Sequence, residues 1–273
     1  MTRILVRPPA REDVSSWRVL GWRAEPDPGR LADEHERFRV ALTDAGAEVL
    51  EARGEPGNLD SIYVYDPVLV TPRGAILLQP GKTGRRGEPG ALAPDLPLEV
   101  VGRLEGNELA EGGDTVWLDE QTLLVGHTYR TNAAGIEALR HLLPGTDVLA
   151  FHLPHLHGRG EVLHLRSLLN PLTPELVVGY RPLMPVPLVE LLETRGIRVV
   201  EVPGEEFETM GPNVLGLPGG HALTLAGNRV TRQRLEAAGF EVLEYDGDEI
   251  SRKGDGGPTC LTLPVDFDAS GSS

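Results

Sequence analysis

The chain has 273 residues, a net charge of −15 at pH 7 and 40% hydrophobic residues. This length and composition support a packed core and indicate one large domain or two small ones. The acidic balance argues against binding to nucleic acid or to an anionic membrane, because both partners require a basic face, and it mildly favours a cationic ligand. No apolar run reaches the length of a membrane span or of a signal peptide, so we expect a cytoplasmic protein.

One phrase recurs five times along the chain: an amphipathic helical stretch, a break that is usually glycine, and a short strand. The five strands centre on Val49, Val100, Val148, Val199 and Val242, so the successive intervals are 51, 48, 51 and 43 residues. We expect helices at residues 31–45, 188–194 and 231–238. Gly196 and Gly239 follow the last two helices as C-terminal caps.

Further strands are expected between these units, at residues 61–70, 75–78, 115–118, 123–125, 176–179, 214–217 and 222–225. Five units of strands plus a helix predict an α/β fold, a five-bladed propeller with pseudo-fivefold repeats. A doubly wound sheet is the alternative, but no glycine-rich phosphate loop follows the first strand and the strands come in pairs. Residues 1–265 would form one domain, and residues 266–273 a disordered tail.

Two irregular stretches are expected to be loops near a functional site. Residues 16–29 contain Trp17 and Trp22, and residues 79–97 are rich in glycine, proline and arginine. Tryptophans in such a loop can close over a ligand, although they also pack on the edge of a core.

Cys260 is the only cysteine, and it follows the turn-rich run Gly256-Gly257-Pro258-Thr259. A single cysteine excludes an internal disulfide and a cysteine-rich zinc site. Its setting is unlike that of an inert core thiol, because glycines allow close approach of the backbone to a ligand. The sequence therefore makes Cys260 a candidate nucleophile that needs partners from elsewhere in the chain.

Two further segments carry candidate acid/base groups. Glu111 and Asp114 flank a glycine pair at the entrance to a strand, a pattern that also fits an ordinary acidic turn. Residues 151–167 hold four of the eight histidines, but their spacing matches no zinc motif, so we expect no metal. His164 alternates with leucines in a strand-like run, which favours a general acid/base, with a buried structural histidine as the alternative.

Asp60 and Asp66 lie six residues apart in a segment that reads as extended, so both side chains would point to the same side. Arg85 and Arg130 place cations in loops and, taken alone, could be surface charges.

These segments together resemble a known family. In order and spacing, residues 60–67, 85–88, 111–114, 130–132, 163–167 and the glycine-flanked Cys260 are similar to the dimethylarginine dimethylaminohydrolases. That family belongs to the guanidine-modifying enzymes, with the arginine deiminases and the amidinotransferases. The resemblance spans roughly residues 3–264 and implies a five-bladed α/β propeller, in agreement with the repeats.

The resemblance implies catalytic and substrate-binding roles. The nucleophile would be Cys260 and the general acid and base His164, while Glu111 and Asp66 would hold the guanidinium. Arg85 and Arg130 would bind the α-carboxylate of the substrate, and Asp60 would be a further polar contact. The implied reaction converts a methylated arginine to citrulline and an amine through a covalent thiouronium, without metal or cofactor.

One position departs from the family pattern. Where the family usually carries Glu-Asp-Pro, this chain has Tyr65-Asp66-Pro67, so a phenol replaces an acid. We expect Tyr65 to belong to the substrate pocket and to reshape it for another guanidino compound. Arginine deiminase or amidinotransferase activity, or a catalytically idle guanidine-binding propeller, are the alternatives. The sequence leaves the oligomeric state open, with a homodimer as one option.

Overall fold

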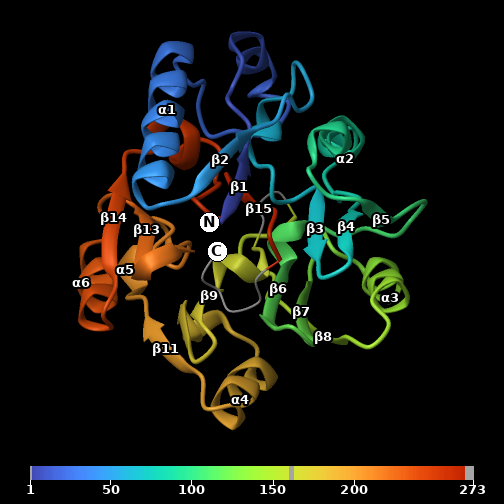
Figure 1. Cartoon of the computed structure of the whole chain (residues 1–273), viewed down its shortest axis with the longest axis vertical. Coiled ribbons are helices and arrows are strands. Elements are labelled where there is room, and N and C mark those ends of the chain that lie inside the picture. Colours follow the sequence, from blue (N-terminus) through green and yellow to red (C-terminus); the bar gives the residue numbers. More distant parts are fainter. Residues whose placement is uncertain (1, 160–162, 268–273) are drawn as a thin grey trace.

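The computed structural model describes residues 2–159 and 163–267. The described strands form five three-stranded sheets, which are arranged around a common centre (Figure 1). This arrangement matches the five predicted repeats and rules out the doubly wound sheet. No helix within the described residues is long and apolar enough to cross a membrane.

The strands are β1 Arg3–Val6, β2 Glu48–Glu51, β3 Val68–Thr71, β4 Gly74–Leu77, β5 Val100–Arg103, β6 Thr115–Asp119, β7 Thr122–His127, β8 Asp147–His152, β9 Leu169–Thr173, β10 Leu176–Gly179, β11 Arg198–Glu201, β12 Leu215–Leu217, β13 His221–Leu225, β14 Glu241–Tyr245 and β15 Leu263–Pro264. The α-helices are α1 Pro28–Asp44, α2 Glu88–Leu92, α3 Ala133–Leu142, α4 Val186–Thr194, α5 Gly204–Phe207 and α6 Arg229–Ala237.

All five sheets share one plan. The middle strand pairs antiparallel with one neighbour and parallel with the other. A helix lies between the two parallel strands in the chain, because a parallel pair needs a crossover connection. These five helices, α1, α2, α3, α4 and α6, lie at the outer edge of the molecule (Figure 1).

The predicted helices and their ends are confirmed to within a few residues. Gly196 and Gly239 adopt φ angles of 68° and 100°, in the left-handed region that ends a helix at little cost only for glycine. The strand that follows each predicted break is the one that joins its sheet in parallel.

Two predicted elements are wrong. Of residues 61–70, only the part within β3 is a strand. Leu59–Ile62 form a 3₁₀ turn, and the Asn58 side chain caps its N-terminus by accepting from the Asp60 backbone N–H. The expected loop at residues 79–97 contains α2, because a proline in the first helical turn, here Pro89, is compatible with a helix.

The ends of the chain close the ring of sheets. β15 pairs antiparallel with β1, with Leu5 opposite Leu263. The Arg3 backbone N–H donates to Asp266 Oδ2 at 2.8 Å, and the Phe267 ring lies edge-on to Trp117 at 5.1 Å. Asp266 and Phe267 therefore correct the prediction of a disordered tail from residue 266, whereas residues 268–273 lie outside the described part of the chain.

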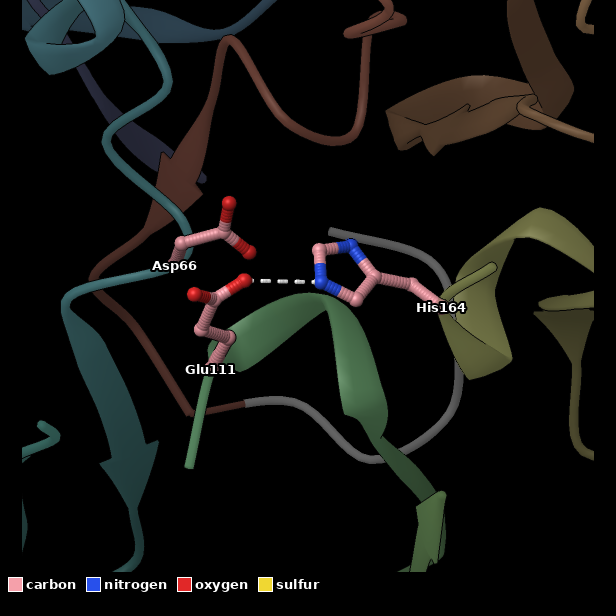
Figure 2. Close-up of side chains that lie close together, drawn as sticks. All are labelled: Asp66, Glu111 and His164. Atoms are coloured by element: carbon pink, nitrogen blue, oxygen red, sulfur yellow. Dashed lines mark hydrogen bonds and ion pairs between the residues drawn. The ribbon is translucent and has the colours of Figure 1, made fainter. Parts of the chain in front are cut away.

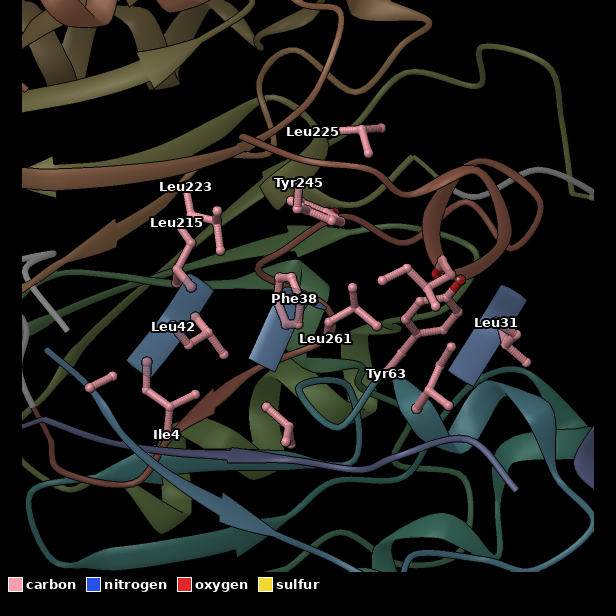
Figure 3. Packing of buried hydrophobic residues seen from close by; sticks show 14 of the residues in the cluster. Ile4, Leu31, Phe38, Leu42, Tyr63, Leu215, Leu223, Leu225, Tyr245 and Leu261 are labelled. Carbon is pink, nitrogen blue, oxygen red and sulfur yellow. Dashed lines mark hydrogen bonds between the residues drawn. The ribbon is translucent and has the colours of Figure 1, made fainter. Parts of the chain in front are cut away.

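The largest hydrophobic cluster joins the outer helix α1 to the segment that carries Cys260 (Figure 3). Phe38 of α1 is fully buried and its ring meets Tyr245 at 4.9 Å in an edge-on arrangement. Leu261, which directly follows Cys260, is also fully buried in this cluster. Packing of α1 against the sheets thus anchors the cysteine turn from one side.

We predict that Phe38→Ala lowers the free energy of unfolding by about 3–5 kcal/mol, because it removes a fully buried ring and leaves a cavity. Chemical denaturation monitored by circular dichroism measures this change. Val40→Ala, at an exposed position of the same helix, is the matched control and should cost little. Equal effects of the two substitutions would contradict this account of the core.

Candidate active site

A cavity of about 320 Å³ contains seven of the eight predicted site residues. They are Asp60, Asp66, Arg85, Glu111, Arg130, His164 and Cys260. The ring of sheets brings them together although they span 200 residues of sequence (260 minus 60).

The repeat explains how the chain delivers these groups. In each unit, the segment that precedes the first strand of the sheet runs into the cavity. Asp66 precedes β3, Glu111 precedes β6, His164 precedes β9, Asn213 precedes β12 and Cys260 precedes β15. Every sheet therefore contributes one polar group from an equivalent place.

Glu111 and His164 form the central pair of the site. His164 Nε2 lies 2.9 Å from Glu111 Oε2, and Glu111 is completely buried. Figure 2 shows Asp66 beside this pair. A Cβ atom on Gly113, two residues after Glu111, would lie 2.3 Å from His164 Nδ1, so this glycine makes room for the imidazole.

Charges near the pair fix its protonation. Burial opposes ionisation of Glu111, but the hydrogen bond from His164 and the Arg130 guanidinium hold its pKa well below the usual range. Burial likewise opposes the charged imidazole, yet the carboxylates of Asp114, Asp66 and Glu111 raise the pKa of His164 to about 9. His164 is therefore an imidazolium at neutral pH and can donate a proton. It precedes a short 3₁₀ turn, Leu165–Ser167, and not the strand that its spacing predicted.

Cys260 is held by its neighbours in a thiol form. Asn213 Nδ2 lies 3.9 Å from the sulfur, and Asn213 Oδ1 accepts hydrogen bonds from both the backbone and the hydroxyl of Thr259. Burial and the Asp66 carboxylate raise the pKa of Cys260 to about 11. A cation bound against Asp66 would reverse part of this effect and favour the thiolate.

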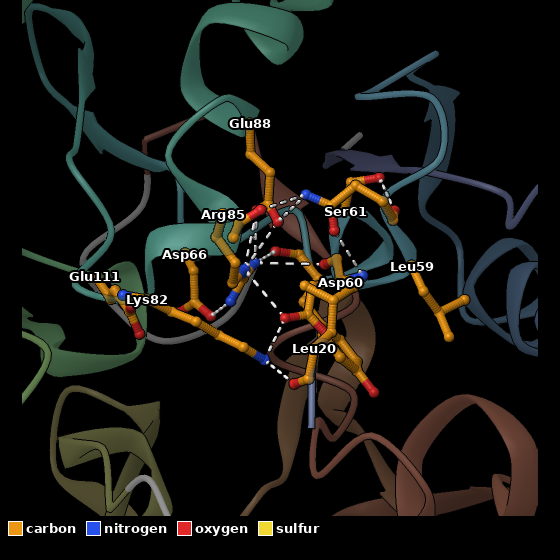
Figure 4. A network of polar contacts seen from close by, with 12 residues as sticks. Leu20, Leu59, Asp60, Ser61, Asp66, Lys82, Arg85, Glu88 and Glu111 are labelled. Atoms are coloured by element: carbon orange, nitrogen blue, oxygen red, sulfur yellow. Dashed lines mark hydrogen bonds and ion pairs between the residues drawn. The ribbon is translucent and has the colours of Figure 1, made fainter. Parts of the chain in front are cut away.

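Arg85 lines the cavity and is engaged by neighbouring side chains. Its guanidinium is buried and pairs with Asp66 and with Glu88, and it also donates to the Tyr63 carbonyl at 3.0 Å (Figure 4). These contacts engage all three guanidinium nitrogens, so Arg85 fixes Asp66 in this structure, and its role in binding a substrate carboxylate stays a prediction.

The predicted pocket residue Tyr65 does not line this cavity. Its ring lines a neighbouring cavity of about 80 Å³, which shares Arg166 with the site. The Arg166 guanidinium lies 4.3 Å from the centre of the Tyr65 ring and also donates to its hydroxyl. The Tyr65 side chain thus contacts the site through Arg166, and the Tyr65 backbone N–H donates to the Cys260 carbonyl at 3.3 Å.

The sequence reasoning missed Lys82 and Asn213, and it placed Trp22 in a loop near the site with closure over a ligand as one option. Lys82 and Asn213 line the cavity, and Trp22 Nε1 donates to Asp60 Oδ1 at 2.7 Å. The repeat could have indicated Asn213, since it stands before the first strand of its unit. Trp22 is buried, so it positions Asp60 instead of closing over the cavity as a lid.

The spacing of Asp66, Glu111 and His164 also suits a cation. One ligand atom from each lies within 4.8 Å of the others, as in a metal site. However, Asp66 already accepts from Arg85 and from the Gly113 backbone, and Glu111 from His164. The oxygens of both acids thus already accept hydrogen bonds from nitrogen donors, the type of group that a guanidinium also presents.

The chain is similar to known proteins over most of its length. A family model described as arginine deiminase matches residues 186–266. The N(G),N(G)-dimethylarginine dimethylaminohydrolase of Pseudomonas aeruginosa is 27% identical over 265 residues, covering 95% of this chain and 98% of that protein. The protein of the same name from Streptomyces coelicolor is 28% identical over 269 residues, covering 96% of each chain.

A solved structure of the P. aeruginosa enzyme, a cysteine-to-serine mutant complexed with citrulline, has a TM-score of 0.77 to this chain. The match covers 96% of this chain and 98% of that one, at 27% identity. Fold and site together define an α/β protein with a central thiol, an imidazole and cation-binding carboxylates. Over nearly its whole length the chain is similar to the dimethylarginine dimethylaminohydrolases.

We predict that Arg85→Met destabilises the protein by about 3–5 kcal/mol, because it leaves Asp66 and Glu88 buried without their cation. Denaturant unfolding checks this. Arg86→Met, at the exposed neighbouring position, is the control and should have little effect. Normal stability of Arg85→Met with a raised KM alone would instead support direct binding of substrate by Arg85.

We also predict that the Cys260 thiol ionises with a midpoint near pH 11 in the free protein. The ultraviolet absorbance of the thiolate during a pH titration measures this, with Cys260→Ser as the blank. Saturating acetamidinium, a planar cation, should move the midpoint down because it offsets the charge of Asp66. An unchanged midpoint in the presence of the bound cation would contradict the electrostatic account.

Proposed function

We propose that the protein is a cysteine-dependent hydrolase of a guanidino compound, with methylated arginine as the leading substrate and citrulline and an amine as products. The observation that carries this proposal is the meeting of Cys260 with the Glu111–His164 pair and Asp66 in one cavity. The names of the two relatives and the citrulline in the solved structure support the substrate class.

The geometry suggests an order of steps. The substrate guanidinium binds against Asp66 and Glu111, which lowers the pKa of Cys260 and releases the thiol proton to water. The thiolate attacks the guanidinium carbon, and the His164 imidazolium protonates the departing amine. A thiouronium on Cys260 remains.

The second half of the reaction uses the neutral His164 left by the first. It removes a proton from a water molecule, which attacks the thiouronium carbon. Collapse of this adduct breaks the C–S bond, and the hydroxyl proton passes to the leaving sulfur, which gives the ureido product and the Cys260 thiol. Arg130 lies 3.1 Å from Glu111, on the wall of the cavity, and is the cation we assign to the substrate carboxylate now that Arg85 is engaged elsewhere.

The match of residues 186–266 to the arginine deiminase model favours a second candidate, release of ammonia from unmodified arginine. The same thiol chemistry serves both reactions, and the leaving amine alone differs. Amidino transfer is a weaker candidate, because it needs a second pocket for the acceptor amine. A catalytically idle binding protein is also a weaker candidate, because it needs no nucleophile.

We further propose that residues 1–265 act as one catalytic domain and that the five sheets form the blades of an α/β propeller around the site. The arrangement of the sheets in Figure 1 supports this description. A cytoplasmic location, a homodimer and the absence of nucleic-acid, membrane and metal partners stay predictions from the sequence.

We predict that purified protein forms a ureido product from at least one of dimethylarginine, monomethylarginine and arginine. A colorimetric citrulline assay, paired with detection of the released amine, measures the reaction and its leaving group. Cys260→Ser should reduce the rate by at least about a thousandfold, because the nucleophile is lost, and a chelator should leave it unchanged. Binding without product from any of the three would favour the idle binding protein, and full activity of Cys260→Ser would refute the scheme.

A further inference from the structure

A lysine of the chain itself lies inside the catalytic cavity. Lys82 Nζ donates to Asp60 Oδ2 at 2.5 Å and to the Leu20 carbonyl, and only a quarter of its side chain is exposed (Figure 4). The backbone N–H of the same residue donates to Glu111 Oε1 at 3.1 Å. Lys82 therefore contacts Glu111 through its backbone and a second acid, Asp60, through its side chain.

This second position is built to hold an ammonium ion. Asp60 is almost fully buried, and Trp22 Nε1 fixes its other oxygen at 2.7 Å. Asp60 Oδ2 and the Leu20 carbonyl both accept from one nitrogen, Lys82 Nζ, as the acceptors of a charged amine do. In this structure the chain supplies that amine itself.

The other carboxylates of the cavity wall are less suited than Asp60 to bind a second cationic group. Glu208 and Asp255 have exposed side chains, at 67% and 50%, and they pair with His157 and Arg23. Asp66 and Glu111 belong to the guanidinium end. Asp60 is thus the buried carboxylate left for a second positive group of a ligand, and Lys82 already neutralises it.

We propose that Lys82 is a specificity-determining residue that competes with a second cationic group of the substrate for Asp60 and the Leu20 carbonyl. The inference rests on the proposed function, because an arginine derivative brings both a guanidinium and an α-ammonium group. The α-ammonium has to displace Lys82 Nζ to reach these acceptors. A guanidino acid without that group leaves Lys82 in place, and the cavity then binds it without this competition.

Ligand binding to inactive protein tests the proposal. In a Cys260→Ser background, calorimetry compares arginine with 5-guanidinopentanoate, which lacks only the α-amino group, for Lys82, Lys82→Met and Lys82→Arg. Lys82→Met should tighten arginine binding by about tenfold or more, because the ammonium site is vacated, and change binding of 5-guanidinopentanoate by less than about threefold. Lys82→Arg keeps a cation and should keep the original preference.

Arg85 Nε lies 3.9 Å from Asp60 Oδ2, so Asp60 keeps a cationic neighbour in Lys82→Met. Thermal unfolding of each variant verifies that it is folded, and Lys82→Arg carries the test if Lys82→Met is not. In that event, the proposal is supported if Lys82→Arg keeps the ratio of affinities for 5-guanidinopentanoate and arginine that Lys82 shows. A loss of that preference for 5-guanidinopentanoate over arginine overturns it.

Two results would overturn the inference. An unchanged ratio of the two affinities in Lys82→Met, or an equal loss of both, would mean that Lys82 is structural or binds the carboxylate that the ligands share. Either result leaves the proposed function intact, since both ligands still bind. Failure of every variant to bind either ligand would instead contradict the proposed function and this inference together.

Discussion

The buried negative charge of Glu111 is the feature on which the rest of the site depends. A carboxylate that is fully buried stays ionised only if cations and hydrogen-bond donors surround it, and here His164, Arg130 and the Lys82 backbone do so. The same charge, with that of Asp66 and Asp114, keeps His164 protonated. The acids thus prepare a proton donor and a cation site by one electrostatic effect.

In the proposed mechanism, the same negative charges oppose ionisation of Cys260, the proposed nucleophile. Negative neighbours and burial hold Cys260 as a thiol, which is a poor nucleophile, until a cation reaches the cavity. This coupling ties activation of the sulfur to the charge of the substrate. Neutral compounds would leave the thiol protonated, so charge recognition and catalysis share the same groups.

The ring of sheets solves a problem of distance. Polar groups from five segments meet because each segment precedes the first strand of its sheet, and those segments point to the shared centre. The fifth segment reaches its place through β15, which pairs with β1 from the opposite end of the chain. Buried Leu261 and the cluster around Phe38 then hold Cys260 in position.

Much of this could be predicted from the sequence, because the helix–break–strand repeat and the glycine-flanked motifs reflect local chemistry. Cys260, His164, Glu111 and Asp66 were candidates on their local sequence, the resemblance to a known family implied their roles, and the structure places all four in one cavity. The predicted extended conformation at Asp60 and His164 was wrong, since short 3₁₀ turns leave no periodic pattern in the sequence.

The roles of other residues depend on contacts that the sequence does not reveal. Arg85 is engaged by Asp66 and Glu88, and Tyr65 turns toward Arg166 and away from the large cavity. Lys82 belongs to no recognisable sequence motif. The folding of the chain brings its amine to Asp60. Each of these depends on which partner a charged or aromatic side chain meets after folding.

The central claim is that the guanidino carbon becomes attached to Cys260 during turnover. Intact-protein mass spectrometry of His164→Gly, mixed with dimethylarginine and quenched in acid, tests it most directly, because loss of His164 should slow hydrolysis of the adduct. The account predicts a mass increase equal to the substrate minus dimethylamine, located on the peptide that contains Cys260. Product formation by the wild type, with no adduct on Cys260 in either protein, would contradict it.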